Sequence, residues 1–391
     1  MDSLFELEQK LLHENEALVH DQSLTSLRQY KYSSIDRSLL SKYVLNPFWT
    51  YCAEFMPPWL APNCITLIGI SAIVFSNLLI VIFQNSDMET PMNRLVYLIF
   101  AISLIFYQTM DNIDGKQARK TGTSSPLGEL FDHGIDSLNC IWGTLLLVSA
   151  FGQGSSIPAV CTIVPPMIAM YLSAWETYYT KTLFLDYFNG PTEGLIVAVV
   201  FQLICVFLGP EFWLRPMFWT FGYPLGDAMA ITMNLLVLFF HVPGCILNVR
   251  RCNPDLLRKR LKNIWPIIAV SFAIFLWTTS PGSVILTGGH LFLFSWALSF
   301  TFGRITTTII LSHLCDQEFP RLNFPTMLLF FGTFVYGVLP RVGLGFLAIG
   351  ELIYIWLYLI LAALYFFFFS KLVIDRITQY LGIHAFKIES L

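Results

Sequence analysis

The sequence predicts an all-α, polytopic integral membrane protein with about ten transmembrane helices and one N-terminal amphipathic helix at the membrane surface. Of the 391 residues, 55% are hydrophobic and 13% are charged, whereas soluble domains usually carry about 25% charged residues. Apolar stretches follow one another from residue 63 onward, each close to the roughly 20 residues that cross a bilayer core. The net charge of −3 gives no sign of nucleic-acid binding.

Residues 1–60 are expected to form a cytosolic segment that ends in the surface helix. The first twenty residues are acidic and polar, unlike a cleavable signal peptide, so we expect a spanning helix to direct membrane insertion. Residues 38–60 alternate apolar and polar positions. Because a spanning segment follows at once, a helix on the membrane is favoured over a soluble amphipathic helix. The aromatic residues expected at the membrane interface are Trp49, Tyr51 and Trp59.

Residues 61–391 are expected to form one transmembrane domain. Lys and Arg gather before the first predicted span and after the second, sixth and tenth, and these places share one side of the membrane if the number of spans is even. The positive-inside rule then places both termini and residues 111–136 at the cytosolic face. The predicted spans lie near 63–84, 95–110, 137–152, 157–178, 191–209, 226–248, 264–280, 283–312, 324–340 and 345–370.

The eight cysteines and three of the histidines are expected to have structural roles only. The eight cysteines are scattered singly with no CxxC pair, so we interpret them as small buried hydrophobes rather than disulfides or zinc ligands. His241, His290 and His313 are lone polar residues in apolar surroundings. For these we expect packing or hydrogen bonding.

Acidic residues interrupt the apolar pattern between residues 111 and 140. Asp111 and Asp114 are three positions apart, and Asp132 and Asp136 are four apart, so each pair shares one face of a helix. The glycine and proline of the KTGTSSP connection predict a turn that makes the two helices antiparallel. Charges in such places are costly unless paired, hydrated or bound to metal, which indicates a functional site. A capped, salt-bridged hairpin without function is the alternative.

Four ionised carboxylates beside a low-dielectric region must take up protons or bind cations. An all-oxygen set suits Mg²⁺, Mn²⁺ or Ca²⁺, and phosphate chemistry favours Mg²⁺ or Mn²⁺. Two ions about 4 Å apart would clamp a pyrophosphate. Gly115, Ala118 and Gly128 leave room for close helix packing or for a diphosphate, and Arg119 is placed to contact phosphate oxygens.

This stretch resembles the signature of the CDP-alcohol phosphotransferase family at every fixed position. The surrounding sequence resembles the eukaryotic cholinephosphotransferases and ethanolaminephosphotransferases in PPWLAPNCITLIG (57–69), PLGELFDHGID (126–136) and NGPTEG (189–194). The resemblance extends from about residue 29 to at least residue 194. The signature positions are Asp111, Asp114, Gly115, Ala118, Arg119, Gly128, Asp132 and Asp136.

The resemblance implies a metal-dependent enzyme that uses Mg²⁺ or Mn²⁺, with two ions bound. It implies that Asp111, Asp114 and Asp132 are metal ligands, and that Asp136 is a ligand or the general base. Asn63 is expected beside the diphosphate, although it could instead cap the first spanning helix. The residues expected to bind CDP are Asn63, Thr66, Tyr107, Asn112, Gly115, Lys116, Ala118, Arg119 and Gly128.

His133 is a candidate for the base that deprotonates the acceptor hydroxyl. A neutral imidazole suits that role better than a metal-bound carboxylate does. His133 could instead orient the neighbouring Asp132 by a hydrogen bond, which would leave Asp136 as the base. Glu129, one turn before His133, could hold or replace it.

The resemblance implies transfer of phosphocholine or phosphoethanolamine from CDP-choline or CDP-ethanolamine to diacylglycerol, giving a phosphatidylalcohol and CMP. It further implies a homodimer in the endoplasmic reticulum or Golgi membrane, with the active site facing the cytosol. Two alternatives are an alcohol phosphatidyltransferase that uses CDP-diacylglycerol and a transporter with an acidic ion site. Tyr107, Trp142 and Tyr171 could surround a choline ammonium group by cation–π attraction.

Overall fold

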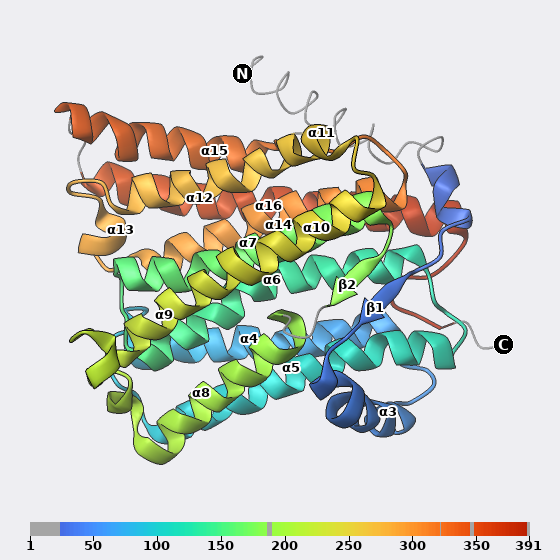
Figure 1. The fold of residues 1–391 in the computed structure, drawn as a ribbon, viewed down its shortest axis with the longest axis horizontal. Coiled ribbons are helices and arrows are strands. Elements are labelled where there is room, and N and C mark those ends of the chain that lie inside the picture. Colours follow the sequence, from blue (N-terminus) through green and yellow to red (C-terminus); the bar gives the residue numbers. More distant parts are fainter. Residues whose placement is uncertain (1–23, 186–189, 321, 345–347, 389–391) are drawn as a thin grey trace.

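Long helices lie side by side in a bundle from residue 62 to residue 381 (Figure 1). The computed structural model describes residues 24–185, 190–320, 322–344 and 348–388. The bundle contains α4 (Pro62–Gln84), α5 (Arg94–Lys120), α6 (Pro126–Phe151), α7 (Ile157–Thr180), α8 (Leu195–Leu208), α9 (Leu225–Leu236), α10 (Val242–Cys252), α11 (Leu257–Leu261), α12 (Trp265–Thr278), α13 (Val284–Thr287), α14 (Leu291–Leu314), α15 (Phe324–Gly332) and α16 (Ala348–Leu381). The short 3₁₀ and π turns are η1 (Thr25–Arg28), η2 (Ser41–Leu45), η3 (Gly190–Gly194), η4 (Pro210–Phe212), η5 (Phe218–Thr220), η6 (Val237–His241), η7 (Lys262–Ile264), η8 (Thr333–Val338) and η9 (Leu339–Val342).

The predicted class, an all-α polytopic membrane protein, is confirmed. Among the described residues, eight helices are long and apolar enough to cross a membrane. A further apolar helix, Thr192–Leu208, is shorter. The long helix α14 also occupies a predicted span, but its serines, threonines and Arg304 lower its hydropathy. The prediction of about ten spans therefore corresponds to eight clear spanning helices together with these two.

One predicted span, 283–312, is wrong in its extent because two separate helices, α13 and α14, occupy it. Gly289 lies between them with φ of +75°, in the left-handed region that favours glycine. This conformation ends α13 and lets the chain start again at Leu291. A search for apolar stretches runs across this break because the segments on both sides of it, 284–286 and 291–294, are apolar.

The helix α14 lies at the centre of the bundle, against α6 and α16. All of its residues except Leu293 and Trp296 are buried. Its contact with α6 is partly polar, since Thr306 Oγ1 donates a hydrogen bond to Ser137 Oγ at 2.6 Å. A buried side-chain hydrogen bond of this kind fixes the register of two packed helices. It therefore holds α6, the helix that carries Asp132 and Asp136.

The predicted surface helix is present as η2 followed by α3 (Asn46–Glu54). Lys120, at the end of α5, donates to the carbonyl oxygens of Ala53 and Glu54, both at 3.1 Å. A cation at this place also compensates the negative end of the α3 dipole. The surface helix is therefore tied to the end of the acidic hairpin.

The three aromatic residues predicted for the membrane interface divide into two groups. Tyr51 is 61% exposed and Trp59 is 72% exposed, as an interfacial position requires. Trp49 is only 4% exposed, so its predicted place at the interface is wrong. An aromatic side chain on an amphipathic helix can serve either face, and Trp49 lies on the face that packs into the protein.

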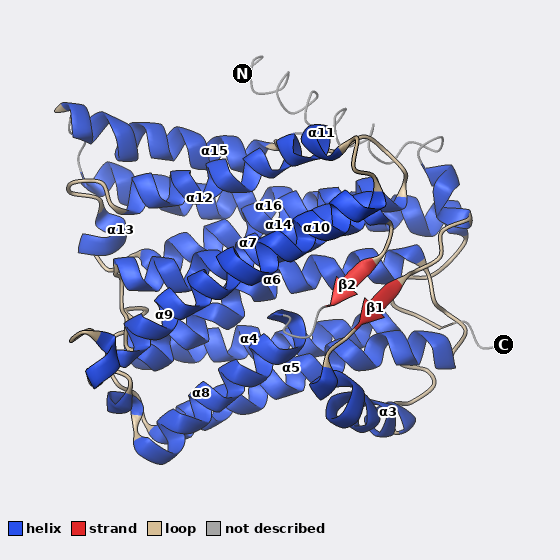
Figure 2. Ribbon diagram, in the orientation of Figure 1, coloured by secondary structure: helices blue, strands red, loops and turns tan. Residues whose placement is uncertain are grey.

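Two three-residue strands form a small parallel sheet, drawn red in Figure 2. β1 (Ser34–Asp36) pairs with β2 (Leu183–Leu185), and Arg37 N donates to Leu185 O at 2.8 Å. The sheet joins the N-terminal segment to the connection that follows α7.

All eight cysteines are free thiols. Cys252 is exposed at the end of α10, so the interpretation of every cysteine as buried is wrong there.

Candidate active site

The acidic stretch folds as a hairpin made by the end of α5 and the start of α6. The connection turns at Gly122, whose φ is +69°. Ser125 caps α6 by accepting a hydrogen bond from Gly128 N at 3.3 Å, and Pro126 stands in the first turn. The predicted turn between the two aspartate pairs is therefore confirmed.

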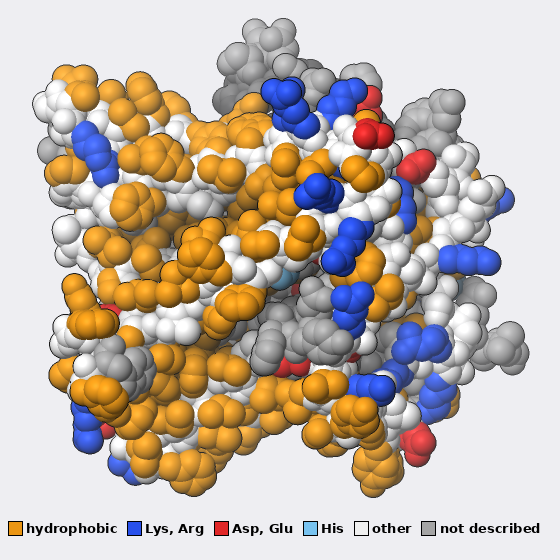
Figure 3. Space-filling view, in the orientation of Figure 1, with side chains coloured by type: hydrophobic (Ala, Val, Ile, Leu, Met, Phe, Trp, Pro, Cys, Tyr) orange, Lys and Arg blue, Asp and Glu red, His pale blue; other side chains and the backbone are white. Residues whose placement is uncertain are grey.

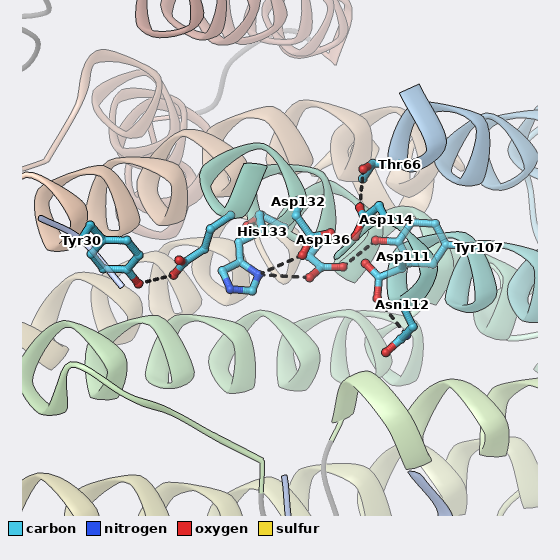
Figure 4. Close-up of polar contacts among 11 residues, drawn as sticks. Tyr30, Thr66, Tyr107, Asp111, Asn112, Asp114, Asp132, His133 and Asp136 are labelled. Carbon is cyan, nitrogen blue, oxygen red and sulfur yellow. Dashed lines mark hydrogen bonds and ion pairs between the residues drawn. The ribbon is translucent and has the colours of Figure 1, made fainter. Parts of the chain in front are cut away.

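Four carboxylates and one imidazole converge beside this hairpin (Figure 4). Asp132, His133 and Asp136 each offer a ligand atom within 4.8 Å of the other two. His133 Nδ1 lies 3.5 Å from Asp136 Oδ2 and 3.8 Å from Asp132 Oδ2. Asp111 and Asp114 reach the same space from α5. The structure thus brings together the aspartates that the sequence spacing paired.

Hydroxyl groups orient two of these carboxylates. Tyr107 Oη donates to Asp136 Oδ1 at 2.6 Å. Thr66 Oγ1, from α4, donates to Asp114 Oδ2. Both donors are buried, and each fixes the orientation of the carboxylate that accepts its hydrogen bond. Tyr107 and Thr66, which were expected to contact CDP, support the acidic group from behind.

Two aspartate oxygens in the site have no hydrogen-bond donor. These are Asp111 Oδ1 and Asp132 Oδ1, both buried. The other oxygen of Asp111 accepts from Asn112 Nδ2 at 3.2 Å. Buried polar atoms are rarely left without a partner, and clustered carboxylate oxygens are the donors that Mg²⁺ and Mn²⁺ prefer. The residues present therefore fit a divalent cation.

A cavity of about 1700 Å³ opens beside the acidic group. Figure 3 shows the face hollowed near its centre, with Lys and Arg side chains gathered at one side of the hollow. The cavity is larger than the roughly 300–1,000 Å³ of most small-molecule sites. Its lining changes from carboxylates at the hairpin to apolar side chains on α7, α8 and the α9–η6 segment. These apolar residues include Pro165, Met170, Phe201, Met229 and Phe240.

The residues predicted to bind CDP occupy two kinds of position. Thr66, Tyr107 and Lys116 are not among the residues that line the cavity. Lys116 Nζ donates to Thr50 Oγ1 of α3 at 3.0 Å, on another side of α5. The predicted residues that do line the cavity are Asn63, Asn112, Gly115, Ala118, Arg119 and Gly128.

Asn63 does not cap the first spanning helix, so that alternative is wrong. Ala61 is the N-cap of α4, and Pro62 takes the first helical position. The side chain of Asn63 instead donates to Ala385 O, after α16, at 2.9 Å. Its amide therefore belongs to the cavity wall rather than to its own helix.

The proposed aromatic cage for an ammonium group is also wrong for the three residues considered. None of Tyr107, Trp142 and Tyr171 lines the cavity. Trp142 stacks on Trp296 with ring centroids 4.7 Å apart, and Tyr171 Oη donates to Asn263 O at 2.7 Å. These rings serve packing between helices, as most aromatic residues of a bundle do.

Tyr30 is a site residue that the sequence motifs did not indicate. Its hydroxyl donates to Glu129 Oε1 at 2.9 Å, and Figure 4 shows the tyrosine reaching the hairpin on the side of His133. The same hydroxyl lies 3.4 Å from His313 Nε2, and the two rings meet edge to face. The expected hydrogen-bonding role of His313 is therefore confirmed. Only the YKYSS segment (30–34), of which Tyr30 is the first residue, could have drawn attention to it.

The fold and site together define a polytopic membrane protein with a carboxylate-lined cavity suited to phosphate chemistry. Residues 59–243 match the family model described as CDP-alcohol phosphatidyltransferase. The chain belongs to this family, as its similarity to curated relatives over almost its whole length also shows. The family and the transferase class expected from the sequence are confirmed.

The curated relatives come from several kingdoms. The chain is 34% identical to choline/ethanolaminephosphotransferase 1 of Arabidopsis thaliana over 389 residues, 93% of this chain and 97% of the relative. It is 33% identical to choline/ethanolaminephosphotransferase 1 of Saccharomyces cerevisiae over 332 residues, covering 79% and 82% of the two chains. It is 31% identical to ethanolaminephosphotransferase 1 of Homo sapiens over 331 residues, covering 80% and 81%.

Proposed function

We propose that this protein transfers phosphocholine or phosphoethanolamine from CDP-choline or CDP-ethanolamine to diacylglycerol and releases CMP. The observation that carries the proposal is a single cavity with a carboxylate–imidazole group at one end and an apolar lining at the other. A nucleotide diphosphate fits the polar end, and acyl chains fit the apolar end. The names of the Arabidopsis, yeast and human relatives support the choice of headgroups.

His133 is the proposed general base. Its Nδ1 faces the carboxylates of Asp132 and Asp136, at 3.8 and 3.5 Å. A proton on Nδ1 is favoured by these neighbours, which leaves Nε2 as the acceptor for the hydroxyl proton of diacylglycerol. The alkoxide oxygen then forms a bond to the β-phosphorus, the bond between that phosphorus and the CMP oxygen breaks, and CMP leaves. Asp136 is the second candidate for the base.

Glu129 and Tyr30 are proposed to position this base. Glu129 stands one helical turn before His133, and one of its carboxylate oxygens accepts the Tyr30 hydrogen bond. The other oxygen, Oε2, is buried without a donor. A carboxylate beside an imidazole stabilises the imidazolium that forms when the base takes up a proton. Tyr30 fixes that carboxylate in place.

Asp111, Asp114, Asp132 and Asp136 are the residues that would hold Mg²⁺ or Mn²⁺, and we propose that they would bind two ions. When bound, the metal would supply positive charge to the diphosphate. The chain's own residues have the remaining tasks: Arg119 binds phosphate oxygens, and Gly115 and Gly128 leave room for the diphosphate. Lys116 is proposed to dock α3 rather than to contact CDP.

The protein is further proposed to work as a homodimer in the endoplasmic reticulum or Golgi membrane, with its cavity open to the cytosol. The cavity lining includes the basic residues Lys31, Arg37 and Arg119, and basic residues favour the cytosolic side of a membrane. Residues 1–60 would then form the cytosolic segment, of which residues 1–23 lie outside the described part of the chain, and residues 61–391 the catalytic domain.

A reconstituted assay tests the proposal. The purified protein would receive diacylglycerol, Mg²⁺ and labelled CDP-choline or CDP-ethanolamine in parallel, with release of CMP and of labelled phospholipid as the readouts. A second set of reactions would supply CDP-diacylglycerol with inositol, serine or glycerol phosphate. Product in the first set supports the proposal. Product only in the second set would show that the protein is a CDP-diacylglycerol-dependent enzyme instead.

A further inference from the structure

The segment that follows α16 returns to the cavity, although 246 positions separate Gly382 from Asp136 of the acidic hairpin. Gly382 has φ of +67° and its N–H caps the helix by donating to Thr378 O at 2.9 Å. Figure 1 shows α16 ending at the side of the bundle where α3 and β1 lie. Beyond the turn, His384, Ala385, Lys387 and Ile388 line the cavity.

Three contacts hold this segment, residues 382–388, in place. Ala385 O accepts the hydrogen bond from Asn63 Nδ2 at 2.9 Å. In the next position, Phe386 O lies 3.7 Å from Cys64 Sγ. The Phe386 ring meets Phe131 of α6 edge to face, with centroids 5.7 Å apart. The segment is therefore fixed against the first turn of α4 and against the helix that carries His133.

The wall formed in this way borders the polar end of the cavity. Asn63, which holds the segment through its nitrogen, directs Oδ1 toward Gly128, where an added Cβ would lie 4.0 Å away. Asn63, Gly128 and Lys387 all line the cavity. Lys387 supplies a positive charge in the lining of the same cavity, and Gly128 leaves space for a ligand at the hairpin. The ligand chemistry that matches this combination is an anionic diphosphate.

We propose that residues 382–388 form one wall of the nucleotide subsite and that Lys387 binds the diphosphate of the CDP-alcohol. This inference rests on the proposed function, because it takes a CDP-alcohol as the ligand. It extends that function to a segment outside the residues that match the family model, which end at 243. Lys387 and Arg119 would provide positive charge on two sides of the diphosphate.

Charge reversal at Lys387 tests the inference in the purified full chain. We expect Lys387→Glu to raise the KM for CDP-choline and its Kd about tenfold, as loss of a charge-assisted phosphate contact should. The KM for diacylglycerol should stay unchanged, and Lys387→Arg should stay within about twofold of wild type because it keeps the charge. Phe386→Ala, which loosens the segment without altering its charge, should also raise the KM for CDP-choline. The matched control is Lys371→Glu on exposed α16 surface, which should change neither constant.

Equilibrium binding of labelled CDP-choline without diacylglycerol separates this inference from the proposed reaction. If wild type binds CDP-choline but forms no phospholipid, the proposed transfer fails, and a Lys387-dependent Kd would still support the nucleotide wall. Wild-type Kd and KM in Lys387→Glu would overturn the inference. So would a defect that appears only with vesicles of anionic lipid, which would assign Lys387 to the membrane surface.

Discussion

Tyr30 Oη donates a hydrogen bond to Glu129 Oε1 at 2.9 Å, although 99 positions separate the two residues. Burial, together with the charge of Glu129, raises the pKa of Tyr30 above its usual value, so the hydroxyl stays protonated and remains a donor. The N-terminal segment thereby contacts the turn of α6 that carries His133. This contact links a residue outside the signature to the proposed base.

Replacing Tyr30 with phenylalanine should lower kcat without weakening nucleotide binding. The variant loses a hydrogen bond to a charged group, worth roughly 1.5–3 kcal/mol, so we expect kcat to fall by at least about tenfold. The KM for CDP-choline should remain close to wild type because Tyr30 supports Glu129 rather than the diphosphate. Steady-state kinetics would be compared with Tyr43→Phe, an exposed tyrosine. A kcat within twofold of wild type would show that Tyr30 does not position Glu129 for the reaction.

Tyr107→Phe should increase the metal concentration that activity requires. Tyr107 orients Asp136 through a 2.6 Å hydrogen bond, and loss of such an outer partner commonly costs about 10–100-fold in metal affinity. The measurement is activity against Mg²⁺ concentration. Tyr97→Phe is the control, because Tyr97 lies on the same helix and is equally buried but contacts Met92 N instead. An unchanged Mg²⁺ dependence in Tyr107→Phe would argue against a metal ligand role for Asp136.

Cys252 provides a test of how the protein is oriented in the membrane. It is exposed at the end of α10, close to the basic stretch 250–262 that is expected at the cytosolic face. A membrane-impermeant maleimide should label Cys252 from the cytosolic side of sealed microsomes, and Cys252→Ser should lose that label. Labelling only after the vesicles are opened would reverse the predicted topology.

Glu351 should matter for stability rather than for catalysis. Its buried carboxylate accepts from Trp277 Nε1 at 2.8 Å, Ser283 Oγ at 2.7 Å and Val284 N at 3.0 Å. Glu351→Ala leaves these donors without a partner, so we expect a loss of about 3 kcal/mol in the free energy of unfolding. Thermal unfolding in detergent would measure it, with the exposed Glu318→Ala as the control. An unchanged melting temperature would contradict this role.

The sequence predicts the parts of this protein that depend on local spacing. Asp111 and Asp114, like Asp132 and Asp136, share a helix face because of their separation, and Gly122 favours the turn that joins the pairs. These relations lie within one hairpin, so a motif can encode them. Spans are predictable for the same reason, since a run of apolar residues needs no partner to identify it. Where Gly289 interrupts such a run, hydrophobicity alone misses the break.

Contacts between distant segments could not be predicted in this way. Tyr30 meets Glu129 across 99 positions, and Asn63 meets Ala385 across 322. Each depends on how the helices pack, which no local pattern records. Trp49 shows the same limit, because the sequence of an amphipathic helix does not determine which of its aromatic residues faces the lipid. The residues missed or misplaced are therefore those whose roles depend on tertiary packing.

The most direct test of the central claim is metal-dependent phospholipid synthesis by the purified wild-type chain and by Asp114→Ala. Wild type should convert CDP-choline or CDP-ethanolamine and diacylglycerol to phospholipid and CMP with Mg²⁺ or Mn²⁺, and a chelator should stop the reaction. Asp114→Ala should be inactive although folded, whereas Asp316→Ala, an exposed acid paired with Lys181, should retain activity. Full activity of Asp114→Ala, or product formed equally well in the presence of chelator, would contradict the proposed role of the acidic hairpin.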